Sequence, residues 1–140
     1  QELDKMLELW ERGLAAAERA VELAPAERRA EAARLAALGK FIRNSIKTTI
    51  NIKNWYMLNI RLLACSDIAE AAGILGELEA IAGREAENAR DTVGIVEFDS
   101  RLGWEPSMEY VTDAWHLDWK QRQLKSALAE ISAYRAMLKL

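Results

Sequence analysis

The chain has 140 residues, 51% of them hydrophobic and 29% charged, so it can form one domain with a substantial core. Its net charge of −3 is too small to indicate a nucleic-acid or membrane partner. The single cysteine, Cys65, excludes an internal disulfide and a multi-cysteine metal site. No stretch approaches the roughly 20 apolar residues that cross a bilayer, and the start lacks a signal-peptide pattern. Because the chain begins with Gln1, we expect a processed chain or a fragment of a longer protein.

Two helices are predicted in the first half of the chain. Over residues 2–24, apolar residues recur at steps of four and three, which is the spacing of one helical stripe: Leu3, Leu7, Trp10, Leu14, Ala17, Val21 and Ala24. Pro25 ends this helix and suits the start of a second one over residues 26–64, which would be about 60 Å long. The second stripe comprises Leu35, Leu38, Ile42, Ile46, Ile50, Met57, Ile60 and Leu63.

Two more helices are predicted in the second half. Asp67 and Glu70 form a capping box that begins a helix over residues 67–101, although its β-branched run TVGIVEF would also suit a short strand. We expect Gly103 to stop this helix in the left-handed conformation, with a loop over residues 102–112. Thr112 or Asp113 then caps a helix over residues 113–138. The fold class is therefore all-α: a single domain forming an antiparallel bundle of about four helices, with two long central helices.

Charge is distributed in blocks that predict how the two long helices face each other. Residues 25–65 carry 8 basic and 2 acidic side chains, whereas residues 66–113 carry 3 basic and 12 acidic ones. A turn at residues 65–66 would place these blocks side by side, and each exposed pair would contribute only about 0–1 kcal/mol. We expect these charge pairs, called the charge ladder below, to set the register of the two helices rather than their stability. The pairs are Arg61–Glu70, Lys53–Glu79, Lys47–Glu85, Arg43–Glu87 and Lys40–Asp91.

Residues 97–120 hold three of the five tryptophans and the only histidine. The same register brings Trp10, Trp104, Trp115 and Trp119 to one end of the bundle and leaves Trp55 apart. One interpretation is a buried aromatic cluster of Trp10, Trp115 and Trp119 that closes this end. The other is that residues 99–112 form a presented loop that meets a ligand or another domain. The candidate contact residues of that loop are Arg101, Trp104, Glu105 and Tyr110.

Several kinds of chemistry can be weighed from residue types and spacing. One histidine cannot supply the two Glu-x-x-His units of a di-iron bundle, and Asp113 with His116 suits a helix cap better than a metal site. We therefore assign no metal, no cofactor and no catalytic residue. Two residue sets remain open: a carboxylate cluster that would suit glycoside hydrolysis, and a polar helix stripe that would bind a polar ligand or face another helix. The carboxylate cluster comprises Glu97, Asp99, Glu105 and Glu109. The polar stripe comprises Asn44, Lys47, Asn51 and Asn54.

The run ENARDTVGIVEFDSRLGWEPSMEYVTDAWHLDWK resembles helical regions near the C-termini of large, mostly uncharacterised bacterial proteins of glycoside-hydrolase type. The likeness covers about the last 55 residues. In such proteins a helical module packs against a sugar-processing barrel. The resemblance implies a carbohydrate context and a catalytic domain outside this chain. It also implies that Arg101, Trp104 and Glu105 contact that domain or its substrate.

The sequence leaves three alternative functions. The first is a non-catalytic helical accessory or interaction module, part of a larger bacterial protein, whose partner is a catalytic domain of the same polypeptide. The second is a free-standing helical interaction protein that forms a homodimer. The third is a glycoside-processing enzyme that uses the acidic cluster near residues 97–109.

Overall fold

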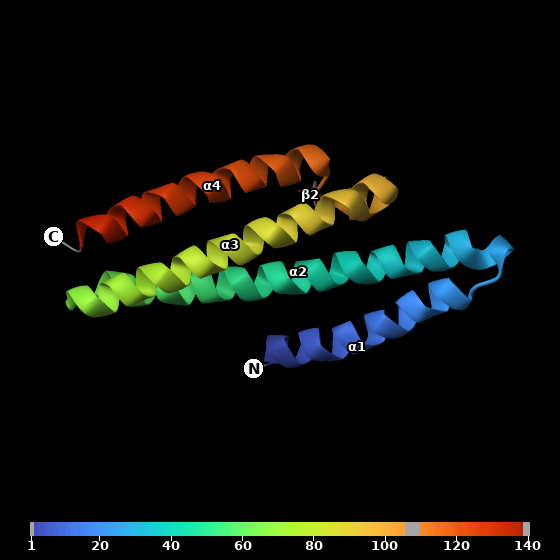
Figure 1. Ribbon diagram of the computed structural model, residues 1–140, viewed down its shortest axis with the longest axis horizontal. Helices are drawn as coiled ribbons and strands as arrows, with labels where there is room; N and C mark the ends of the chain where they lie inside the picture. Colours follow the sequence, from blue (N-terminus) through green and yellow to red (C-terminus); the bar gives the residue numbers. More distant parts are fainter. Residues whose placement is uncertain (1, 106–109, 139–140) are drawn as a thin grey trace.

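The structure, a computed structural model, describes residues 2–105 and 110–138, and it leaves the side chains of Glu105 and Tyr110 undescribed. Its helices are α1 (Glu2–Leu23), α2 (Ala26–Ala64), α3 (Ile68–Phe98) and α4 (Ala114–Met137). Consecutive helices are antiparallel, and α1 and α4 lie on opposite sides of the long α2–α3 pair (Figure 1). The predicted all-α fold class with two long central helices is confirmed. No helix within the described ranges has an apolar stretch long enough to span a bilayer.

Local signals explain where the helices begin. Pro25 is extended and directly precedes α2. The Asp67 side chain accepts a hydrogen bond from the backbone N–H of Glu70 at 2.7 Å, which satisfies one unpaired donor at the start of α3. Asp113 does the same for the backbone N–H of His116 at 2.8 Å. The predicted helix starts therefore agree with the structure.

The predicted end of the third helix is wrong. Helix α3 ends at Phe98, and a 3₁₀ turn η1 (Ser100–Gly103) leads into the short strands β1 (Trp104–Glu105) and β2 (Tyr110–Val111). Gly103 does not adopt the left-handed conformation; a Cβ there would lie 2.3 Å from the carbonyl oxygen of Thr112. Glycine is needed because two backbone segments approach closely, rather than for a positive φ. The TVGIVEF run is helical.

The core is built around α3. One cluster joins α2 and α3, and the other joins α3 and α4. Helix α3 therefore has buried residues on the sides that face two neighbours, which explains its high apolar content. The buried members are Leu58, Ile74, Leu75, Leu78 and Ile81 in the first cluster, and Ala89, Val96 and Leu117 in the second.

The predicted register of α2 against α3 is confirmed. Arg61 Nη2 lies 3.5 Å from Glu70 Oε1 at the turn. Farther along, Thr48 Oγ1 donates to Glu85 Oε1 at 2.6 Å, so the neighbouring Lys47 is level with Glu85. Most of the expected charge ladder has other partners, because α1 and α4 flank the central pair. The observed ion pairs are Lys40–Glu18 and Lys47–Glu11 toward α1, and Arg135–Glu79 and Lys120–Glu85 toward α4.

The predicted aromatic cluster is not formed. Trp10 lies between α1 and α2, where its Nε1 donates to the carbonyl oxygen of Gly39 at 2.8 Å. Trp115 and Trp119 lie on α4, on the opposite side of the α2–α3 pair, and both are exposed. Trp119 instead lines a groove with Trp55, the residue expected to stand apart. The register gives the height of each tryptophan along the bundle but not the side on which its helix packs.

Candidate functional site

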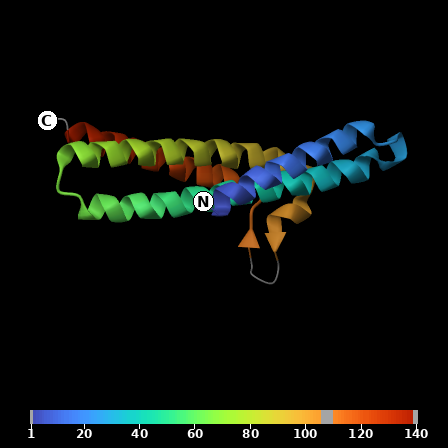
Figure 2. The same cartoon turned by 90° about the horizontal axis from the view of Figure 1, so that it is seen from below.

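The predicted loop is a small hairpin that projects from the helices (Figure 2). Its strands pair antiparallel, with Trp104 opposite Val111 and Glu105 opposite Tyr110. The backbone N–H of Thr112 donates to the carbonyl oxygen of Gly103 at 2.5 Å and closes its base. The sequence did not predict these strands, because two residues each are too few to give an alternating pattern.

Arg101 is held within the chain. Its Nε donates to Asp99 Oδ1 at 2.8 Å and its Nη2 to Asp99 Oδ2 at 2.6 Å, which is a two-point contact between guanidinium and carboxylate. This contact lowers the pKa of Asp99 from 3.8 to about 2, and Asp99 raises the pKa of Arg101. The guanidinium of Arg101, which we expected to meet a partner, thus binds Asp99 just before the hairpin.

Replacing Arg101 with alanine should raise the pKa of Asp99 from about 2 toward 3.8, because the largest cause of the lowered value is the Arg101 hydrogen bond. A carboxylate with a lowered pKa stabilises the folded state above pH 3.8, and this contribution fades as the pH falls toward 2. Carboxyl-carbon NMR titration measures the shift. Arg90→Ala, at an exposed position of α3, is the control; an unchanged Asp99 pKa in Arg101→Ala would contradict the assignment.

The other predicted contact residues are only partly described. Trp104 is exposed and its cross-strand neighbour Val111 lies on the same face of the hairpin, so together they form an apolar spot. The backbones of Glu105 and Tyr110 are paired, but their side chains lie outside the described atoms. Among the predicted contact residues of the hairpin, Trp104 is thus shown to be exposed.

The acidic cluster is only partly described. Glu97 is exposed, Asp99 is occupied by Arg101, and Glu109 and the side chain of Glu105 lie outside the described part of the chain. Across the residues that are described, no three His, Cys, Asp or Glu side chains gather to hold a metal ion. His116 Nδ1 lies 2.7 Å from Asp113 Oδ1 within the helix cap.

The polar stripe on α2 faces other helices rather than a ligand. Asn44 and Asn51 are buried, Lys47 pairs with Glu11 of α1, and Asn54 is exposed. Asn44 Nδ2 donates to Thr92 Oγ1 of α3 at 2.8 Å. The stripe is therefore divided: Asn44 and Asn51 belong to a network inside the protein, Lys47 faces α1, and Asn54 is exposed.

Glu85 is the centre of that network. Its side chain is 7% exposed, and its two oxygens accept hydrogen bonds from Thr48 and Asn51, both at 2.6 Å, and from Lys120 of α4. Asn88 Nδ2 extends the network to the carbonyl oxygen of Asn44 at 2.8 Å and to Thr48 Oγ1 at 3.0 Å. We call this set the polar seam: Asn44, Thr48, Asn51, Glu85, Asn88, Thr92 and Lys120.

The polar seam fixes how the helices pack. Donors from α2 and α4 use three of the roughly four acceptor positions of the Glu85 carboxylate, and each bond specifies one register of the helices. Sequence reasoning missed Glu85 as its centre. The available signal was the spacing of Glu85, Asn88 and Thr92, which places three polar residues on one face of an otherwise apolar helix.

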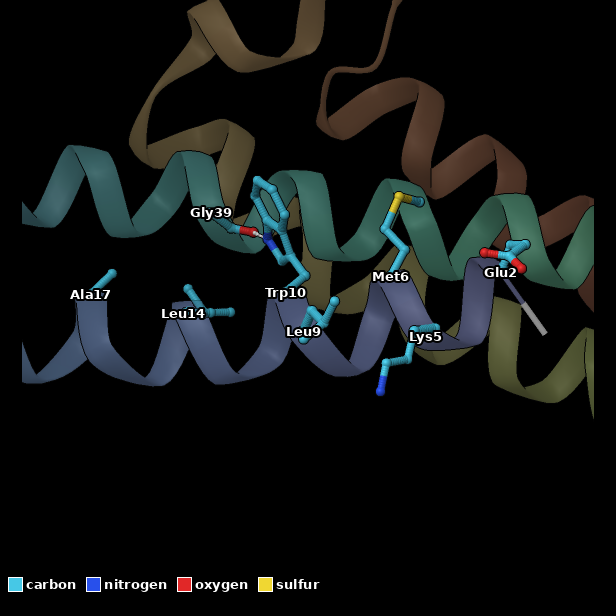
Figure 3. Close-up of a pocket in the computed structure, with 9 residues that line it drawn as sticks. Glu2, Lys5, Met6, Leu9, Trp10, Leu14, Ala17 and Gly39 are labelled. Atoms are coloured by element: carbon cyan, nitrogen blue, oxygen red, sulfur yellow. Dashed lines mark hydrogen bonds between the residues drawn. The ribbon is translucent and has the colours of Figure 1, made fainter.

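An apolar groove runs between α2 and α4 above α3. Its walls include Ile52 and Trp55 on one side and Trp119 and Leu124 on the other, and its volume is about 440 Å³. Glu85 also lines it, beside its partner Lys120. A second apolar hollow of about 520 Å³ lies along α1, where Met6, Leu9, Trp10 and Leu14 are the large apolar side chains (Figure 3).

One face of α2 is left without a helical neighbour. We call it the bare face, and it comprises Ser45, Thr49, Ile52, Tyr56, Ile60 and Leu63, at steps of four and three along the helix. All six side chains are exposed and none is charged. In Figure 2 no helix lies against this stretch of α2 on the side turned away from α3. The adjoining groove shares Ile52 with the bare face.

Comparison with family models, curated proteins and solved structures gives no match to this chain. The candidate site consists of the bare face, whose six exposed side chains carry no charge, and the adjoining groove, which is mainly apolar and also contains the paired Glu85 and Lys120.

Proposed function

We propose that this chain is a non-catalytic helical interaction module that binds a protein partner through the bare face of α2 and the adjoining groove. The main support is the surface area. The chain exposes 9546 Å², whereas a compact monomer of its 15.8 kDa mass should expose about 7,300 Å². An excess of this size indicates an open arrangement of helices whose apolar sides lack cover.

The composition of the exposed surface supports the same proposal. Interface centres are enriched in aromatic residues and depleted in charge, and Trp and Tyr are the residues that most often dominate binding energy. The bare face and groove have this character. Their exposed large apolar side chains are Ile52, Tyr56, Ile60, Leu63 and Trp119.

The bacterial origin, the carbohydrate context and a catalytic domain as partner are finer parts of this proposal. They are supported by the resemblance of about the last 55 residues to regions of glycoside-hydrolase-type proteins. On this view such a domain binds the projecting hairpin, where Trp104 is exposed, and this contact lies apart from the bare face.

Site-specific photo-crosslinking tests the proposal in cells that express the chain naturally. A benzophenone amino acid at position 52 should form one adduct of defined mass, because Ile52 lies at the centre of the bare face. The matched control is position 35, since Ile52 and Leu35 are both on α2 and are 63% and 64% exposed.

Mass spectrometry of the adducts identifies the partner and the attachment site. The proposal is supported if position 52 gives an adduct and position 35 does not. It is refuted if position 52 gives none, or if both positions capture the same mixture of proteins.

A further inference from the structure

We infer that the partner is a second copy of this chain, which packs its α2 antiparallel against α2 across the bare face. This inference rests on the proposed function, because it names the occupant of the same surface. Three observations carry it: the absence of charge on the bare face, the order of small and large residues along it, and the surface area that is left exposed.

The absence of charge permits self-association. In a two-fold interface the same patch lies on both sides, so any charged residue near its centre meets a like charge. From Ser45 to Leu63 none of the six side chains of the bare face is charged at neutral pH. The nearby basic residues of α2 have acidic groups of α1 or α3 beside them. Lys40 and Lys47 pair with Glu18 and Glu11 of α1. Lys53, next to Ile52 in the chain, is close enough to Asp4 of α1 to lower the pKa of that carboxyl, and Arg61 pairs with Glu70. Two copies of the bare face therefore meet without like-charge repulsion.

The residue order favours the antiparallel direction. The bare face has small side chains at one end, Ser45 and Thr49, and large ones at the other, Ile60 and Leu63. Antiparallel pairing about a point near residue 54 places Ser45 opposite Leu63 of the second copy, so small side chains of one copy pack against large side chains of the other. Parallel pairing would leave a gap at the small end and crowd the large end. Close packing favours the first arrangement.

The exposed area is sufficient for a stable dimer. The excess over a compact monomer is about 2,200 Å² per chain, and stable homodimers bury from about 1,600 to more than 5,000 Å² in total. If each of the two chains covers half of its excess area, the dimer buries about 2,200 Å² in total, which lies in this range. The contact also needs little ordering of the backbone, because Thr48 and Asn51 fix the buried side of α2 to Glu85.

Sedimentation equilibrium of the purified chain is the first arm of the test. We expect a mass twice the 15.8 kDa of one chain. Ile52→Lys should raise the dissociation constant at least about 100-fold, because it places a charge near the two-fold axis of each copy. Leu35→Lys is the matched control: antiparallel pairing near residue 54 carries position 35 past the end of the second α2 at Ala64. Circular dichroism checks that both variants remain helical.

Disulfide trapping is the second arm and tests the direction of pairing. In a Cys65→Ser background, oxidising a mixture of Ser45→Cys and Leu63→Cys chains should give a mixed dimer. Ser45→Cys alone should give none, since its two copies would be about 27 Å apart along the axis.

The outcomes separate this inference from the proposed function. A wild-type dimer that Ile52→Lys dissociates, with the mixed disulfide formed, supports the inference. A monomeric wild type whose position 52 crosslinks to a different protein overturns the inference and leaves the proposed function standing. A monomeric wild type with no crosslink at position 52 overturns both, and a dimer that Ile52→Lys does not weaken overturns the inference.

Discussion

Replacing Glu85 with alanine should lower the free energy of unfolding by about 3–5 kcal/mol, because it leaves the partners of a buried carboxylate without an acceptor. Thr48 and Asn51 of α2 and Lys120 of α4 all donate to Glu85, so one substitution loosens both neighbours of α3. Urea unfolding at a fixed protein concentration measures the change, since association would otherwise shift the midpoint.

Glu87→Ala is the control for this substitution, because Glu87 is an exposed carboxylate two residues from Glu85 on α3. Its effect should stay within about 0.5 kcal/mol. Equal effects of the two substitutions would show that the polar seam contributes no specific stability, and the assignment of Glu85 as its centre would then be wrong.

Leu78→Ala should cost about 2–5 kcal/mol, because it leaves a cavity in the cluster between α2 and α3. Leu78 is 2% exposed and belongs to the same cluster as Leu58 and Ile74. Thermal or urea unfolding measures the loss, again at one protein concentration.

Leu23→Ala is the matched leucine control, since Leu23 is 85% exposed at the end of α1. It should change the free energy of unfolding by less than about 0.5 kcal/mol. A comparable loss in both variants would contradict the division between core and surface described above.

The helix starts were predictable from sequence because caps are local. Asp67, Asp113 and Pro25 act on residues within one turn, so their effect does not depend on how the helices later pack. The register of α2 against α3 was also predictable, since one short turn and two opposite charge blocks fix it. Arg61–Glu70 is the direct result.

The side on which each helix packs was not predictable. Hydrophobic spacing shows that a helix has an apolar stripe, but it does not show whether a neighbour covers the whole stripe. The second stripe is an example: Ile46 is buried, whereas Leu35, Met57 and Leu63 are exposed. The tryptophan prediction failed for the same reason, because it used height along the bundle and assumed a closed one.

The candidate site was only partly predictable. Residues 99–112 were recognised as distinct, and Trp104 is indeed exposed there. Periodicity weighs residues by hydropathy, so it treats a buried Glu85 as a surface residue and gives no reason to inspect it. The bare face could not be predicted from the sequence either, because the exposure of Ile52 and Tyr56 depends on which sides of α2 are covered by other helices.

Hydroxyl-radical footprinting across a dilution series tests most directly whether the bare face is an interface. If a second copy covers it, Ile52 and Tyr56 should react slowly at high concentration and gain reactivity on dilution. Leu35 and Trp104, equally exposed but outside the contact, should react at the same rate throughout. If the reactivity of Ile52 and Tyr56 does not change with concentration, no second copy covers the bare face and the inferred dimer is contradicted.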